Sequence, residues 1–219
     1  MFQPRFWSDR ALLAYTGGAA LTLAAAWQWG GGETLLLLAA PLWLIPLAVY
    51  DLRCREVPHL AWVAGPCLLA FVIAVLRGDW ALSLLALISV VTSERWRRPA
   101  RQRRPILLFG LTACGWLLTG IAAPLFIAAA AVLGFWLMFE LGWWAGADAL
   151  AALTLILLRP TAGVVLAIGL AHLIWAVTLK AAWRWPRPQS SDELVAHGQP
   201  GLPALALAAG LNAIWCFLF

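Results

Sequence analysis

Two aspartates lie at the edges of apolar runs, where an acidic side chain needs an explanation. Asp51 closes the run 35–50, and Asp148 directly precedes the run 149–158. Burying a charged carboxylate is costly, so an acid at such a boundary is a functional-site hypothesis. Two neighbouring carboxyls can activate one water, because like charges oppose double ionisation and one group keeps its proton. We therefore predict a paired carboxylate site formed by Asp51 and Asp148.

The alternative to a functional role is that each aspartate only stabilises a helix end, and this explanation suits Asp148 better than Asp51. Asp148 precedes an apolar run, so its side chain is well placed to cap the N-terminus of a helix. Asp51 follows an apolar run, and the dipole at a helix C-terminus disfavours an anion. Small residues (Gly142, Ala145, Gly146) precede Asp148 and allow close backbone approach. They favour a recessed polar pocket inside a helix bundle.

The elements that position these acids are predicted to be helices. Apolar runs separated by charged residues, glycine or proline predict nine of them, at about 11–29, 34–50, 58–76, 80–94, 106–120, 123–141, 147–158, 161–180 and 202–219. The run 147–158 is short, and Pro160 discourages its extension. No internal repeat is visible. We expect a single domain over 1–219, with an extra N-terminal helix at about 11–29 and a core at about 35–219.

Composition predicts where this bundle resides. The chain has 219 residues, of which 63% are hydrophobic and 11% charged, whereas an average domain has about a quarter charged residues. If successive helices cross the membrane in alternating directions, every Lys and Arg except Arg77 and Arg159 lies on the same side as the N-terminus. Cytoplasmic segments of membrane proteins are enriched in Lys and Arg, so this side would be the cytoplasm. We therefore expect an all-α, polytopic transmembrane bundle of about 8–9 helices in the cell (plasma or inner) membrane, with a cytoplasmic N-terminus and lipid contacts.

Three segments together resemble prepilin peptidases. The first motif of that family, an aspartate at a helix end followed by basic residues and Val-Pro, resembles YDLRCREVPHLAW at 50–62. The second, built around GxGD, resembles GADALAAL at 146–153, although alanines occupy 145 and 147. The entry to the family's last helix is similar to GQPGLPALALAAG at 198–210. The form of the first motif is closest to archaeal preflagellin peptidases.

The resemblance implies a GxGD-type intramembrane aspartic peptidase that cleaves the leader of type IV prepilin-like proteins at the cytoplasmic membrane face. Asp51 and Asp148 would be catalytic, and Glu56 and Gly146 would support substrate binding. Glu56 has a second explanation, a local pair with Arg53 or Arg55. The cysteine-rich module of bifunctional relatives is absent, so we expect no N-methyltransferase activity. The alternative function is a catalytically inactive relative that acts as a membrane scaffold or assembly protein.

Other candidates have weaker support. A transporter would place its acids near the membrane midplane on broken helices, which the motifs argue against. His172 lies inside an apolar run, where it is either a proton relay or a hydrogen-bonded packing histidine, and we expect the second. Glu140 either contacts the pocket or simply ends a helix. We expect the arginine-rich segment 94–105 to set the membrane topology and to contact lipid headgroups rather than to bind RNA. No nucleic-acid partner is therefore expected. No ligand cluster predicts a metal, and no cofactor is expected.

Overall fold

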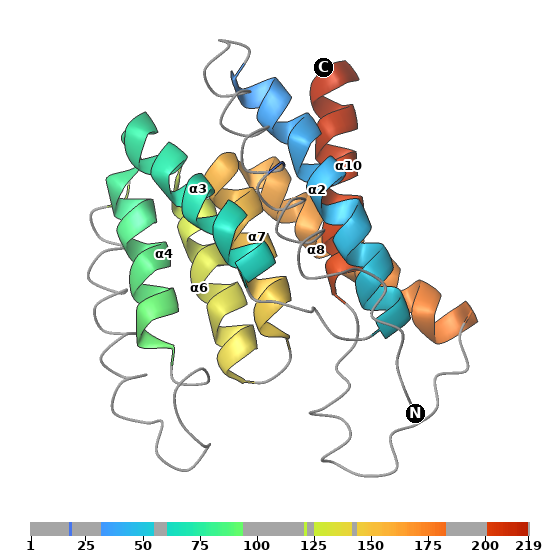
Figure 1. Cartoon of the computed structure of the whole chain (residues 1–219). Helices are drawn as coiled ribbons and strands as arrows, with labels where there is room; N and C mark the ends of the chain where they lie inside the picture. The colour runs from blue at the N-terminus through green and yellow to red at the C-terminus, as the bar shows by residue number, and fades with distance from the viewer. Residues whose placement is uncertain are drawn as a thin grey trace.

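The computed structural model describes residues 18, 32–54, 61–93, 121, 125–141, 144–182 and 201–218. Within these ranges every regular element is a helix (Figure 1). The helices are α2 (Gly32–Cys54), α3 (Ala61–Arg77), α4 (Trp80–Thr92), α6 (Phe126–Glu140), α7 (Gly146–Leu158), α8 (Ala162–Ala182) and α10 (Leu202–Leu218). The all-helical class and the positions of these seven helices agree with the sequence pattern. The predicted helices at 11–29 and 106–120 lie outside the described residues, apart from Gly18.

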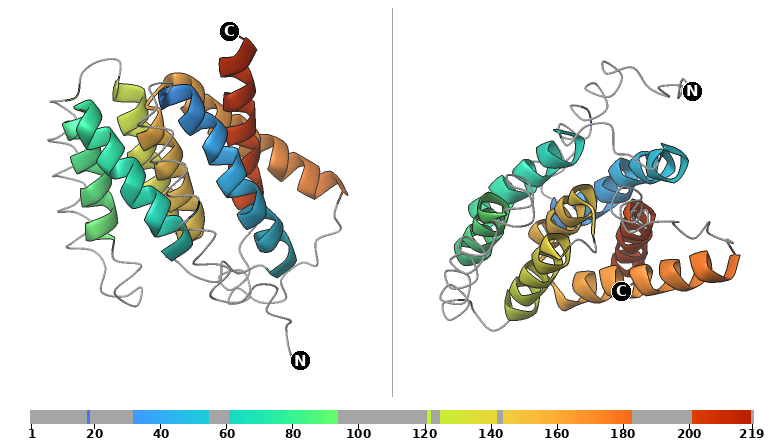
Figure 2. Two further views of the ribbon diagram at one scale, coloured as in Figure 1. Left: turned by 45° about the horizontal axis from the view of Figure 1, so that its top comes forward. Right: turned by 90° about the horizontal axis from the view of Figure 1, so that it is seen from below.

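Helix α7 occupies the centre of this arrangement. It contacts each of the other six helices, and of its 13 residues all but Gly146 are buried. Seen from below, α6 and α7 lie between the pair α3–α4 and the pair α2–α10 (Figure 2). Alanine fills many of the buried positions of α7, including Ala151 and Ala152, so neighbouring helices can approach its backbone closely. The first turn of α7 after Gly146, which includes Asp148, is therefore buried in the core.

Local sequence sets the ends of the helices around α7. Gly78 has a φ of 94°, a left-handed conformation that glycine adopts readily. Its N–H donates to the carbonyl of Val75 at 3.0 Å, and the N–H of Asp79 donates to the carbonyl of Ala74 at 2.9 Å. This pair of bonds is the Schellman ending of a helix, and it turns the chain from α3 into α4. After Pro160, the hydroxyl of Thr161 accepts a hydrogen bond from the N–H of Val164 and caps α8.

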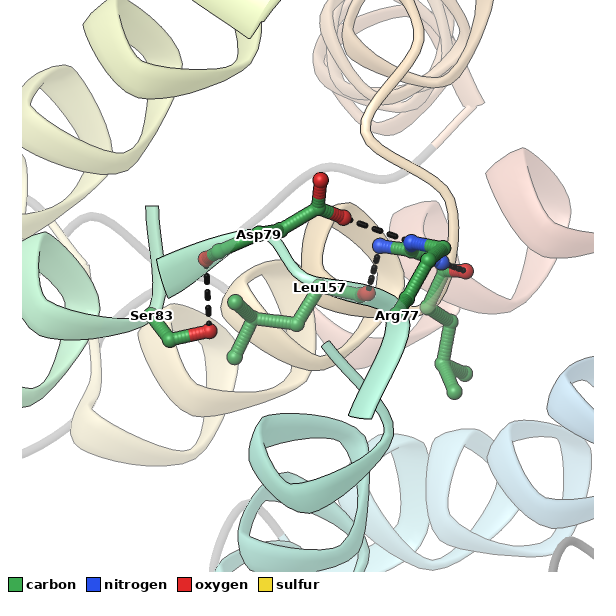
Figure 3. A network of polar contacts seen from close by, with 5 residues as sticks. Arg77, Asp79, Ser83 and Leu157 are labelled. Atoms are coloured by element: carbon green, nitrogen blue, oxygen red, sulfur yellow. Dashed lines mark hydrogen bonds and ion pairs between the residues drawn. The ribbon is translucent and has the colours of Figure 1, made fainter. Parts of the chain in front are cut away.

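The C-terminal end of α7 is held by Arg77 (Figure 3). The guanidinium donates from Nη1 to the carbonyl of Leu158 at 2.8 Å and from Nη2 to the carbonyl of Leu157 at 2.9 Å. Its Nε donates to Oδ2 of Asp79 at 2.5 Å. The last carbonyls of a helix have no partner within the helix and attract a cation. Arg77 therefore fixes the end of α7 to the turn between α3 and α4.

The expected membrane topology is contradicted. Over the residues that the structure describes, no helix is both long enough and apolar enough to cross a membrane. Helices α4, α6 and α7 have 13, 15 and 13 residues, whereas a span needs about 20. The prediction of a bundle of 8–9 transmembrane helices is therefore wrong, and so is the multi-pass membrane location. The cytoplasmic placement of the N-terminus was derived from that topology and loses its support.

The membrane prediction was wrong because amino-acid composition does not show how apolar residues are distributed in the fold. A high apolar content does not say how far one helix continues before a turn interrupts it. Part of the apolar content forms the core around α7, and part lies on outward faces, where Leu42, Leu68 and Leu166 are 68%, 65% and 70% exposed. Counting apolar residues cannot separate these two uses.

The contacts of Arg77 predict a stability effect. Replacing Arg77 with Met removes the guanidinium and leaves the carbonyls of Leu157 and Leu158 without these donors. We expect the free energy of unfolding to fall by about 2–3 kcal/mol, because hydrogen bonds to charged groups are among the stronger ones. Urea denaturation followed by circular dichroism measures the change.

Asp79→Asn is the matched control for Arg77→Met. It weakens the ion pair but leaves both donors to α7 in place, so its cost should stay below about 1 kcal/mol. Equal stability of Arg77→Met and the parent protein would show that the guanidinium does not hold α7.

Candidate active site

Asp51 and Asp148 lie on helix ends at the same side of the bundle. Asp51 is in the last turn of α2, and Asp148 is in the first turn of α7. These two helix ends and the beginning of α10 all point to the lower side of Figure 1. The side chains are 8% and 4% exposed, and the charge of Asp51 acts on the carboxyl of Asp148. The two predicted residues are therefore electrostatic neighbours, and their role in chemistry stays a prediction.

The local geometry of Asp148 follows from its place in α7. Ala145 is the N-cap residue and has an extended backbone with φ −76° and ψ 158°. Asp148 is three residues further on, where an acidic side chain can reach back to the N–H of the cap residue. The N–H of Ala145 does donate a hydrogen bond to the Asp148 carboxyl. Asp148 thus accepts a hydrogen bond from a backbone N–H at the start of α7, as the capping explanation proposed. The N-cap position itself is occupied by Ala145.

The surroundings of Asp148 favour its neutral form. Burial removes water from the carboxyl and raises its pKa well above the ordinary value, and the negative charge of Asp51 raises it further. The hydrogen bond from Ala145 acts in the opposite direction but is the smallest of the three influences. A carboxyl that keeps its proton beside a second carboxyl can donate a hydrogen bond or a proton. This is the chemistry that a general acid needs.

The beginning of α10 forms another boundary of the site. Gly201 directly precedes α10 and lies against the carboxyl group of Asp148. Helix α10 packs on α2 and also contacts α7, so it joins the two helices that carry the aspartates. Sequence reasoning did not include Gly201 among the site residues. Two signals were available: the Pro200-Gly201 pair before the last apolar run, and the position of Gly201 inside the third quoted segment at 198–210.

An aromatic stack supports the segment just before Asp148. The indole of Trp144 stacks on Phe135 with a centroid distance of 4.7 Å and on His172 with a distance of 4.5 Å. His172 is hydrogen-bonded through Nδ1 to the carbonyl of Ile168 at 2.9 Å. Burial lowers the pKa of His172, which favours the neutral ring. These contacts favour the packed histidine over the proton relay.

The remaining predicted residues have separate places. Glu140 is the last residue of α6 and accepts a hydrogen bond from the hydroxyl of Ser93 at the end of α4. This contact favours the helix-end interpretation of Glu140. Gly146 is the first residue of α7 and is partly exposed. Glu56 and the arginine-rich segment 94–105 lie outside the described residues. In the described ranges no three His, Cys, Asp or Glu side chains gather as metal ligands.

An apolar cavity of about 340 Å³ lies between α3, α4 and α7, and neither aspartate belongs to its lining. Its lining consists of Cys67, Leu68, Phe71, Ala86, Leu87, Val90, Leu150, Leu153 and Leu157. Burial raises the pKa of the Cys67 thiol to about 11, so the reactive thiolate is scarce at neutral pH. Cys67 is therefore mostly in its neutral, weakly nucleophilic thiol form.

Comparison of the chain with protein-family models, curated proteins and solved structures found no match. The resemblance to prepilin peptidases therefore rests on the three quoted segments alone.

The raised pKa of Asp148 predicts a pH-dependent difference between the parent protein and Asp148→Asn. A carboxyl with a raised pKa in the folded state stabilises the fold below its unfolded pKa of about 3.9, and this contribution is lost as pH rises through the folded value. Asparagine does not titrate. The melting temperature of Asp148→Asn relative to the parent should therefore increase from about pH 4 to about pH 8. Thermal unfolding at the two pH values measures it, and a constant difference would contradict the assignment.

Proposed function

We propose that the chain is an aspartic endopeptidase in which Asp51 and Asp148 act together on one water molecule. The observation that carries the proposal is the buried carboxyl of Asp148, whose pKa is raised by burial and by the nearby charge of Asp51. Unequal protonation of two neighbouring carboxyls divides the roles of acid and base between them. Because the two groups titrate as a pair, neither role is assigned to one residue.

The reaction needs only these two groups and water. The ionised carboxylate takes a proton from the water as its oxygen attacks the peptide carbonyl carbon. The protonated carboxyl donates a hydrogen bond to the carbonyl oxygen and stabilises the tetrahedral intermediate. The carboxyl that took the proton from water then donates it to the leaving nitrogen as the C–N bond breaks, so the products are a carboxylic acid and an amine and the pair again holds one proton. No other reactant is required.

The proposed substrate class comes from the three motifs. We infer that the chain cleaves the leader peptide of type IV prepilin-like proteins, because the segments at 50–62, 146–153 and 198–210 resemble peptidases of that specificity. The aspartates are 8% and 4% exposed, so a peptide reaches them only when the ends of α2, α7 and α10 separate. Binding of the leader would have to stabilise this opened arrangement.

A second function is favoured by the same burial. If the ends of α2, α7 and α10 do not separate, no peptide reaches the aspartates, and Asp148 only stabilises the start of α7. The chain would then be a non-catalytic assembly protein built on a peptidase-like scaffold. Alanines at 145 and 147, in place of the family's glycines, also favour this alternative. A catalytic assay of the parent protein separates the two functions.

The test is cleavage of a synthetic peptide that spans the leader junction of a type IV prepilin, followed by mass spectrometry. We expect the parent protein to cut the peptide. Asp51→Asn and Asp148→Asn should each lower kcat by about 10³-fold or more, since each removes one of the two proton-transfer groups.

Glu140→Gln is the matched control, because it removes the charge of a different acid, one that accepts a hydrogen bond from Ser93 and has no proposed part in the reaction. Its cleavage rate should stay within about twofold of the parent. Near-parental activity in either aspartate variant would refute the shared-water mechanism. Absence of cleavage by the well-folded parent would favour the assembly function.

A further inference from the structure

Gly201 contacts the reactive end of Asp148, although the two residues are far apart in the sequence. A Cβ atom built on Gly201 would lie 2.5 Å from Cγ of Asp148 and 2.7 Å from Oδ1. Non-bonded carbon atoms are comfortable at about 3.5–4.0 Å, so no side chain fits here while the carboxyl keeps its position. The main chain at the entry to α10 is therefore in direct contact with the carboxyl group.

Other described glycines do not share this constraint. A Cβ on Gly210, which lies in α10 itself, would meet nothing within 4 Å, and the same holds for Gly134 and Gly169. The close approach is thus specific to the position that faces Asp148. It cannot be explained by general tight packing of α10.

The contact closes the surroundings of the carboxyl from the side of α10. The N–H of Ala145 binds the carboxyl from the start of α7, and Gly201 covers it from the start of α10. The carbonyl of Gly201 accepts the N–H of Leu205 at 3.2 Å, which ties this covering residue to the first turn of the helix. Helix α10 in turn packs along α2, the helix of Asp51. The position of Gly201 is therefore fixed relative to both aspartates.

We propose that Gly201 is a positioning residue for Asp148: its lack of a side chain lets the entry to α10 hold the carboxyl in a dry position beside Asp51. The catalytic consequence rests on the proposed peptidase function, whereas the effect on the carboxyl does not. A methyl group at position 201 pushes the carboxyl away from α10 and lets water reach it. Hydration stabilises the charged form, so the pKa of Asp148 moves down toward its ordinary value.

The experiment compares Gly201→Ala with Gly210→Ala, a control that adds the same methyl group to α10 in open space. Titration of carbon-13-labelled aspartate by NMR reports the protonation of Asp148, whose signal is assigned with Asp148→Asn. We expect Gly201→Ala to lower the pKa of Asp148 by about one unit or more and Gly210→Ala to leave it unchanged. An Asp148 titration in Gly201→Ala that matches the parent would overturn the proposal.

Cleavage of the leader peptide provides the second readout. In Gly201→Ala we expect kcat to fall by about 10-fold or more while KM stays within about twofold, because the substituted residue orients a reacting group. An unchanged kcat would overturn the positioning role. If the parent protein does not cleave the peptide, the peptidase function fails, and the titration still decides whether Gly201 positions the carboxyl.

A double-mutant comparison covers the case in which Gly201→Ala is too unstable to titrate. Asp148→Ala removes the carboxyl that the new methyl group would strike. Gly201→Ala should lower the melting temperature by about 4 °C or more in the parent and by less than about 1 °C in the Asp148→Ala background. Equal losses in the two backgrounds would show that Gly201 does not act through Asp148.

Discussion

The fold is organised around the burial of one ionisable carboxyl at the start of its central helix. Asp148 is 4% exposed and belongs to α7, which touches every other described helix. Removing a charged carboxylate from water costs several kcal/mol, and a buried acid commonly avoids this cost by keeping its proton. The N–H of Ala145 gives the buried Asp148 carboxyl one hydrogen-bond donor. The charge of Asp51 then disfavours a second negative charge close by, so packing and electrostatics favour the same protonation state.

The two ends of α7 are held in different ways. At the C-terminal end, Arg77 binds the carbonyls of Leu157 and Leu158 and is itself paired with Asp79. At the N-terminal end, the Asp148 carboxyl is bounded by Ala145 and by Gly201. A helix fixed at both ends cannot slide along its neighbours without breaking these contacts. The position of the carboxyl is therefore determined by the packing of α7 as well as by its own hydrogen bond.

Sequence patterns predicted the parts of this arrangement that depend on neighbouring residues. Pro160 limited the run at 147–158, and α7 ends at Leu158. The apolar boundaries singled out Asp51 and Asp148, and both are buried. The high apolar content and the distribution of basic residues predicted membrane spans, and this prediction was wrong. Helices α4 and α7 have 13 residues each, and no helix among the described residues is both long enough and apolar enough to cross a membrane.

Two other contacts between distant parts of the chain were not predicted from the sequence. Arg77 bonds to carbonyls 80 and 81 residues away, and the sequence analysis had named it only as one of two basic residues on the side opposite the N-terminus. Gly201 meets Asp148 only because α10 packs between its neighbours in one particular way. A glycine needed for contact and a glycine in an ordinary loop look the same in a single sequence.

The claim that Asp51 and Asp148 form one titrating pair is tested most directly by following Asp148 in the protein that lacks the other charge. Carbon-13 NMR of labelled aspartate would record the titration of Asp148 in the parent and in Asp51→Asn. The account predicts that the pKa of Asp148 falls in Asp51→Asn, because the repulsion between the two carboxylates is removed, yet stays above its ordinary value because the group is still buried. An Asp148 titration that is the same in both proteins would contradict the account.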